Sequence, residues 1–153
     1  MKSKYIYILH LSFFLLLSCH FSFAQQNEID SLKKVLQAAS KEDSSKVNIL
    51  NALCFQLQNT GDYVNAMGYA LKAYYLAEKI GFQKGVGTAL NYSGLIYNQQ
   101  GNYPKALDYF LKAQKIREQI GNKKEIASTL NNLGTVYYAE KIISRRWIII
   151  CRH

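Results

Sequence analysis

The chain contains 153 residues, of which 49% are hydrophobic, 13% aromatic and 19% charged. This length suits one domain, and nine Gly, one Pro and three Cys exclude collagen-like, proline-rich and disulfide-dense proteins. The formal net charge of +9 would favour a nucleic-acid ligand if it covered a folded surface. However, residues 25–140 hold 13 Lys/Arg against 10 Asp/Glu, and the other six positive charges lie near the two ends. We therefore expect no nucleic-acid binding.

Residues 1–24 have the pattern of a cleaved secretory signal peptide. Lys2 and Lys4 precede an apolar stretch over residues 5–17, and residues 22–24 (Ser-Phe-Ala) place small side chains at the −3 and −1 positions of a cleavage site. The apolar stretch is shorter than the roughly 20 residues that a membrane span needs. The pattern predicts an exported, periplasmic protein.

A second processing route stays open. Leu16-Leu17-Ser18-Cys19 resembles a bacterial lipobox, in which the cysteine is lipidated and becomes the mature N-terminus, although Leu17 fits that pattern poorly. Both routes export the chain, and the membrane enters the prediction only through the signal or through lipidation at Cys19.

A short helix is predicted next, at Asp30-Ser31-Leu32-Lys33-Lys34-Val35-Leu36, with Asp or Ser as its N-cap. Leu32, Val35 and Leu36 give this helix one apolar face. We expect residues 25–45 to cover the first unit of the following array as an N-terminal cap.

The middle of the chain repeats with a period of forty residues. The offset holds without gaps for these sets: Leu50, Leu90 and Leu130; Asn51, Asn91 and Asn131; Gly61 and Gly101; Tyr63 and Tyr103; Ala66 and Ala106; Ala73 and Ala113; Gly81 and Gly121. We divide the array into unit 1 (46–85), unit 2 (86–125) and a partial unit 3 (126–140).

Each complete unit reads as two helices separated by a turn. Apolar residues recur three and four apart, which is helical spacing. Gly61 and Gly101 break the units in the middle, Gly81 and Gly121 end them, and Pro104 fits the first turn of a helix. Such a pair of helices cannot bury both of its faces alone, so neighbouring pairs must stack.

These residues resemble the tetratricopeptide repeat (TPR). The matching residues of unit 2 are Leu90, Gly94, Tyr97, Gly101, Tyr103, Ala106, Phe110 and Ala113, whereas unit 1 departs at Cys54, Leu57 and Ala70. The resemblance implies an all-α, right-handed superhelical α-solenoid. The forty-residue period is similar to the longer variety found in kinesin light chains and bacterial regulators. The layout from signal to repeats is similar to the exported sensor region of Bacteroidetes-type TPR histidine kinases and regulators.

The resemblance also implies a peptide-binding groove. The position shared by the three asparagines faces the concave side in that family, where amide groups can grip an extended peptide. The candidate groove residues are Asn51, Phe55, Gln58, Asn91, Leu95, Asn98, Asn131, Thr135 and Tyr138. The opposing interpretation is that asparagine only caps and solvates helix faces.

No set of residues predicts catalysis, a cofactor or a metal. The histidines are His10, His20 and His153, which lie in the predicted signal and at the last position. The segment 85–87 (Gly-Val-Gly) lacks the Lys-Ser/Thr of a phosphate loop. Cys54 is expected to be a buried, inert thiol, and the twelve Tyr are assigned mainly to the core.

The third unit stops in mid-pair. The period predicts Gly or Asn near position 141, but residues 141–153 are basic and apolar, without an acidic or turn residue. We interpret this aberrant tail as the product of a frameshift or truncation; the alternative is a peptide that touches a membrane surface. We expect the apolar face of 126–140, including Leu133 and Val136, to sit at an open end and to allow self-association.

The sequence therefore predicts a non-catalytic module that binds a protein or peptide, as an N-terminal part of a larger bacterial signalling protein. One alternative is a stand-alone exported scaffold or lipoprotein. An alternative of another class is the non-catalytic part of an enzyme whose catalytic domain is missing downstream.

Overall fold

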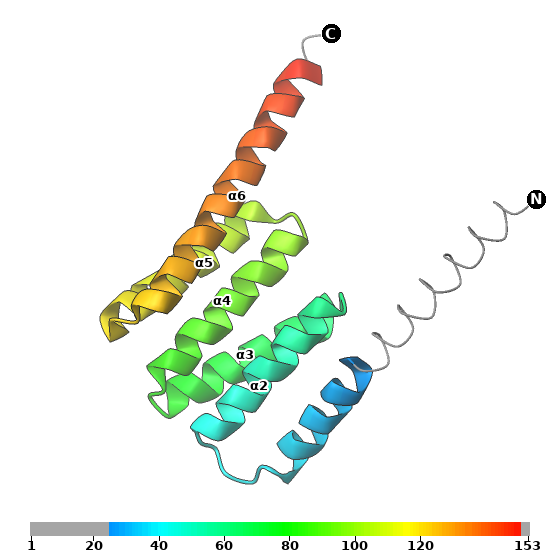
Figure 1. The fold of residues 1–153 in the computed structure, drawn as a ribbon, viewed down its shortest axis with the longest axis vertical. Helices are drawn as coiled ribbons and strands as arrows, with labels where there is room; N and C mark the ends of the chain where they lie inside the picture. Colours follow the sequence, from blue (N-terminus) through cyan, green and yellow to red (C-terminus); the bar gives the residue numbers. More distant parts are fainter. Residues whose placement is uncertain (1–24, 151–153) are drawn as a thin grey trace, which may run out of the picture.

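The computed structural model describes the backbone of residues 25–150 and the side chains of residues 25–141. The predicted signal peptide, the lipobox and residues 151–153 lie outside this part of the chain. All regular structure within it is helical (Figure 1). A helix over residues 25–38 precedes α2 (Ser44–Asn59), α3 (Tyr63–Lys79), α4 (Gln83–Gln99), α5 (Tyr103–Ile120) and α6 (Lys123–Ile150). Among these described helices, none combines the length and the apolar character needed to cross a bilayer.

Glycines in the left-handed region separate the helices at a spacing of twenty residues. Gly61, Gly81, Gly101 and Gly121 have φ angles of 82°, 71°, 74° and 76°, a conformation that costs glycine little because it has no Cβ. The predicted helix breaks at these four glycines are thereby confirmed. After three of these turns a side chain caps the next helix or its first turn: Asp62 accepts from Asn65 N, Asn102 from Lys105 N and Asn122 from Glu125 N.

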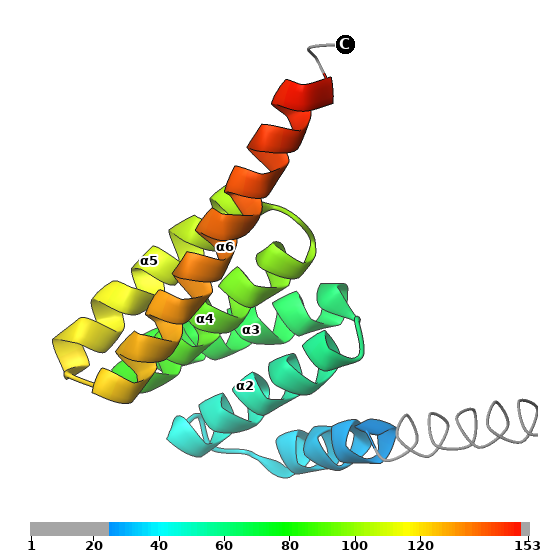
Figure 2. The same cartoon turned by 45° about the horizontal axis from the view of Figure 1, so that its top comes forward.

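The series of glycine turns stops at Lys141. This position is the next in the twenty-residue series, and α6 continues through it to Ile150. The helix predicted over 126–140 is thus longer at both ends. Its C-terminal turns extend past the ends of α4 and α5 (Figures 1 and 2).

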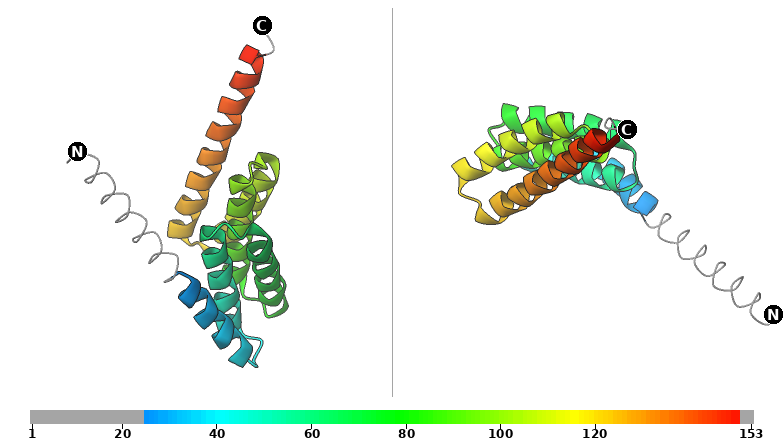
Figure 3. Two further views of the ribbon diagram at one scale, coloured as in Figure 1. Left: turned by 90° about the vertical axis from the view of Figure 1, so that its right-hand side faces the viewer. Right: turned by 90° about the horizontal axis from the view of Figure 1, so that it is seen from above.

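The helices form a stack in which the two sides are unequal. We call α2, α4 and α6 the A helices, and α3 and α5 the B helices. Besides packing on their chain neighbours, α2 contacts α4 and α4 contacts α6, whereas α3 and α5 make no direct backbone approach within the described chain. Because the A helices are close and the B helices are splayed, the stack curves with the A helices on its inner side (Figure 3).

Pairs of small and large residues fill the space inside each unit. In unit 2, Gly94 of α4 lies under the fully buried Phe110 of α5: a Cβ on Gly94 would be 2.7 Å from the ring. Unit 1 has Cys54 and Ala70 at these positions, both fully buried. The larger side chain on one helix and the smaller one on the other keep each pair closely packed.

The N-terminal helix differs from its prediction. It already includes residues 25–30, so neither Asp30 nor Ser31 is its N-cap. Its contact with the array uses Ile29, which is 2% exposed and packs with Leu53 of α2, while Val35 is 49% exposed. Leu32 and Leu36 of the predicted apolar face do pack on the core, so the face extends one turn further toward the N-terminus, and only Val35 is not part of it.

The open face of α6 also differs from its prediction. Leu133 and Val136 are buried against Ala106 and Phe110 of α5, so they are not the residues left uncovered. Among the described side chains of α6, the exposed large apolar residues lie on another side of the helix: Leu130, Tyr137 and Tyr138 are 50%, 54% and 69% exposed.

Candidate functional site

The inner side of the stack carries two sets of predicted groove residues at equivalent positions of the A helices. In the first set, Phe55 and Thr135 are exposed and Leu95 is half-buried; Phe55 also contacts the ring of Tyr92 on α4, with centroids 5.8 Å apart. In the second set, Gln58 is buried, Asn98 is half-buried and Tyr138 is exposed. Accessibility increases toward α6 in the second set, whereas Leu95 in the middle is the least accessible residue of the first set.

The three asparagines do not form a uniform ladder. Asn51 is 5% exposed and its Nδ2 donates to Gly85 O at 3.5 Å, whereas Asn131 is exposed. Asn51 Oδ1 and Gln58 Oε1 are buried and accept no hydrogen bond from the described residues. Asn91 is 7% exposed, and its Oδ1 accepts from Asn132 Nδ2 at 3.2 Å and from Arg117 at 3.1 Å. The structure gives Asn51 and Asn91 the role of joining successive A helices.

A buried arginine organises the joint between units 2 and 3. Arg117 of α5 is 5% exposed, and its Nη1 donates to Asn91 Oδ1, to Glu125 O and to the Thr129 hydroxyl. Its Nε lies 3.2 Å from Glu125 Oε2. Burial lowers the pKa of Arg117, and the nearby Glu125 carboxylate and Tyr92 hydroxyl act in the opposite direction. The guanidinium is thus desolvated and held by partners from α4 and α6.

The joint between units 1 and 2 has no such network. The positions equivalent to Arg117, Glu125 and Thr129 are Ala77, Gly85 and Ala89, all buried. A Cβ on Gly85 would lie 2.7 Å from Val47 Cγ1 and 2.6 Å from the ring of Phe82. One joint is therefore built by close apolar contact and the other by buried polar groups.

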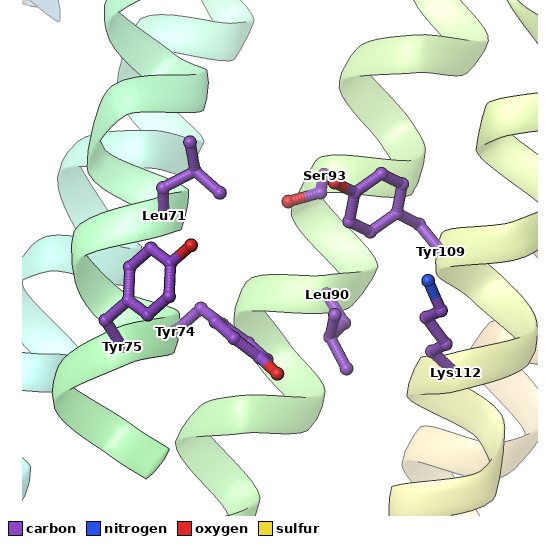
Figure 4. Close-up of a pocket in the computed structure, with 7 residues that line it drawn as sticks. All are labelled: Leu71, Tyr74, Tyr75, Leu90, Ser93, Tyr109 and Lys112. Carbon is purple, nitrogen blue, oxygen red and sulfur yellow. The ribbon is translucent and has the colours of Figure 1, made fainter. Parts of the chain in front are cut away.

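A second concave region lies on the outer side, between the splayed B helices. Its cavity of about 220 Å³ is lined by residues of α3, α4 and α5: Leu71, Tyr74, Tyr75, Leu90, Ser93, Tyr109 and Lys112 (Figure 4). Lys112 pairs with Asp108 at 2.7 Å, and this hydrogen bond raises its pKa. Burial raises the pKa of Tyr109. The predicted groove residues do not line this cavity. The helical spacing assigned the tyrosines mainly to the core, but Tyr75 is 67% exposed and is therefore not a core residue.

Cys54 is the free cysteine of the described residues, and its side chain is buried. Burial raises the pKa of the Cys54 thiol to about 12, so this group stays protonated at neutral pH. Within the described chain, no three His, Cys, Asp or Glu side chains come together as metal ligands. The polar groups that do converge, around Arg117, bond to one another across a helix joint.

Sequence reasoning missed Arg117, Glu125 and Thr129. Their signal was present in the forty-residue alignment, where all three depart from small residues of unit 1 at the same joint. Departures that coincide in this way indicate residues that contact one another. The signal for the tyrosine-lined cavity was weaker, because helical spacing alone does not distinguish a core tyrosine from an exposed one.

Comparisons with known proteins agree with this architecture. Residues 85–141 match the profile of the tetratricopeptide repeat. Among 38 matching chains of solved structures is the crystal structure of BtubC (BKLC) from P. vanneervenii, with 18% identity and a TM-score of 0.69 over 84% of this chain. The chain spans 55% of the length of that structure. Curated proteins give no match. The chain thus matches a tetratricopeptide-repeat profile over residues 85–141, and its fold is similar to that of the solved structure.

Proposed function

We propose that the chain is a non-catalytic module that binds an extended peptide segment along its A helices. TPR repeats generally bind protein partners, and they suggest an interaction module here. The observation that carries the proposal is the unequal stack: A helices that adjoin one another bring equivalent positions of α2, α4 and α6 onto one curved surface.

The side chains on this surface fit a peptide. Phe55, Leu95 and Tyr138 offer apolar area, and Asn98 and Asn131 offer amide groups that can both donate to and accept from a peptide backbone. Beneath them, the buried Asn91 ties α4 to α6 through Asn132. Because the spacing between the A helices is fixed, the binding surface is preorganised, which lowers the free-energy cost of binding a flexible peptide.

The wider context that we propose is an exported N-terminal part of a bacterial signalling protein. This rests on the signal-like residues 1–24 and on the order of signal, short helix and repeats. The site at which the signal is cleaved distinguishes a secreted protein without a lipid anchor from the lipoprotein alternative. The intact mass of the mature chain will show an N-terminus at Gln25 for signal cleavage, or a lipid-modified Cys19 for an anchored protein.

A displayed library of random peptides tests the groove. We expect selected peptides to bind the full chain and to lose at least tenfold in affinity, about 1.4 kcal/mol, when Leu95 or Tyr138 is changed to Asp. The matched controls are Val64→Asp and Tyr75→Asp, which place the same charge on α3 at side chains that are 82% and 67% exposed. Peptides that respond to the α3 changes and ignore those on α4 and α6 would place binding elsewhere and contradict the proposal.

A further inference from the structure

One buried position on the outer side of the stack departs from the repeat. At the forty-residue offset, Ser93 of α4 corresponds to Leu53 of α2 and Leu133 of α6, and all three side chains are buried. Serine is smaller than leucine and carries a hydroxyl, so it leaves space and a polar group where the other two A helices fill the core. Ser93 lines the cavity of about 220 Å³ between α3 and α5. The departure from leucine therefore contributes to the hollow.

The hydroxyl groups of this cavity are available to a ligand. Ser93 Oγ donates to Ala89 O at 3.0 Å, which leaves its oxygen able to accept a further hydrogen bond. Tyr74, Tyr75 and Tyr109 also line the cavity, and none of their hydroxyl groups is hydrogen-bonded to another described residue. In Figure 4 the hydroxyls of Ser93, Tyr75 and Tyr109 point into the space between α3 and α5.

The walls of the cavity are aromatic, and the charge that lines it is positive. Tyr74 and Tyr75 stand on α3, opposite Tyr109 on α5 (Figure 4). Lys112 is the one charged lining residue in the described chain, and its ammonium lies 5.5 Å from the centroid of the Tyr109 ring. Both side chains of its ion pair with Asp108 are more than half exposed. Because such pairs are weak, an anion in the cavity can compete for the ammonium.

We propose that this cavity binds an aromatic carboxylate, a planar ring that carries one negative charge. Such a ring packs favourably against tyrosine side chains, and its carboxylate accepts from the Lys112 ammonium and from the free hydroxyls. An apolar cavity of about 150 Å³ holds benzene, so about 220 Å³ accommodates one ring with its carboxylate. The cavity lies between the B helices, away from the inner side of the A helices, so the inference goes beyond the proposed function.

Benzoate is the direct probe, titrated with the full chain and followed through the NMR signals of the ligand. We expect saturable binding. Benzamide has the same ring without the charge, and cyclohexanecarboxylate has the same charge without a planar ring; each is expected to bind at least threefold more weakly. Equal binding of benzoate and either analogue overturns the assignment of an aromatic anion, and so does a lack of saturable binding.

Ser93→Leu restores the side chain of the other two units and fills the cavity. We expect benzoate to bind this variant at least tenfold more weakly, with no loss of stability in urea unfolding. Benzoate that binds a folded Ser93→Leu variant with unchanged affinity would lie outside the cavity and would contradict the proposal.

Two lysine variants test the charge and decide alone if Ser93→Leu does not fold. Lys112→Gln is expected to weaken benzoate binding about threefold, a typical strength for an exposed charge contact. Lys105→Gln is the matched control on the same helix: its ammonium lies 5.1 Å from the centroid of the Tyr97 ring, and it does not line the cavity. An equal effect of the two changes would show that Lys112 does not hold the carboxylate, and would overturn the proposal.

Discussion

Gly94 and Gly134 occupy the same position in consecutive units, yet their surroundings are opposite. Gly94 is enclosed by the Phe110 ring, while Gly134 faces open space. Both lie inside helices with negative φ. The local cost of glycine in a helix is the same at both positions, so any difference between them comes from packing alone.

Alanine at these two positions is expected to change stability in opposite directions. Gly94→Ala overpacks a buried ring and should lower the free energy of unfolding by about 1–3 kcal/mol. Gly134→Ala meets no neighbour and should raise it by up to about 1 kcal/mol through helix propensity. Urea unfolding of the two variants measures both changes; a stabilising Gly94→Ala would mean that Phe110 does not cover this glycine.

At the scale of the helices, the joint between units 1 and 2 and the joint between units 2 and 3 are filled by different kinds of side chain. Ala77, Gly85 and Ala89 let α3 and α4 approach closely, whereas Arg117, with its partners on α4 and α6, fills the second joint with polar groups. A buried ion pair adds little net stability when complete, but losing one partner leaves the other charge uncompensated. The second joint is therefore the more sensitive to a single substitution.

Arg117→Ala is expected to destabilise the chain by about 3 kcal/mol, the low end for a buried pair that loses one partner. The matched control on the same helix is Lys112→Ala, whose pair with Asp108 has both side chains more than half exposed and should cost about 1 kcal/mol or less. Thermal and urea unfolding measure both. Equal effects of the two changes would show that the Arg117 network is solvated.

Combining Arg117→Ala with Glu125→Gly and Thr129→Ala recreates the residues of the first joint. We expect this triple variant to lose less stability than the sum of the three single variants, because it removes the unpaired groups together. Strict additivity in the same unfolding experiments would indicate that these three residues do not act as one network.

At the scale of the whole molecule, stability is expected to decline toward α6. The central helix α4 has nine buried residues and neighbours on both sides, whereas α6 buries Thr129, Leu133 and Val136 among its described side chains. Repeat arrays are stabilised by contacts between nearest neighbours, so an end unit with one uncovered face opens first.

Native-state hydrogen exchange will measure this gradient. The amides of α4 should exchange slowest and those of α6 fastest among the five helices α2–α6, with the difference greatest beyond Lys141. Uniform protection over all helices would mean that the array unfolds as one unit instead.

Much of the fold could be predicted from the sequence because it depends on local chemistry. Glycine at a fixed spacing set the turns, and helical periodicity set the helices between them. The sequence marked Gly94 and Phe110 as matching residues of the repeat, but it did not predict that the Phe110 ring lies over Gly94. Residues 25–29 could not be assigned to the first helix in this way, because they carry no capping signal and their place in it depends on Ile29 packing on α2.

The candidate site was less predictable, because burial depends on contacts between units. Repetition placed Asn51, Asn91 and Asn131 at one position, but their exposure depends on which helix follows. Asn91 is buried because Arg117 and Asn132 reach it, while Asn131 is exposed because no further unit covers α6 in the described chain. Equivalent positions at the end of an array differ in environment from those inside it.

The joint between units 1 and 2 and the joint between units 2 and 3 differ in their side chains, and we expect this difference to disfavour one misfolded arrangement. A stack of similar helices is prone to slip by one whole unit, with α6 taking the place of α4 against α2 and α3. Glu125 would then stand at the place of Gly85, where even a methyl group would lie 2.7 Å from Val47. Its carboxylate would face Ala77 in place of a guanidinium. We therefore expect the steric clash at the position of Gly85 and the unpaired carboxylate to disfavour the slipped arrangement.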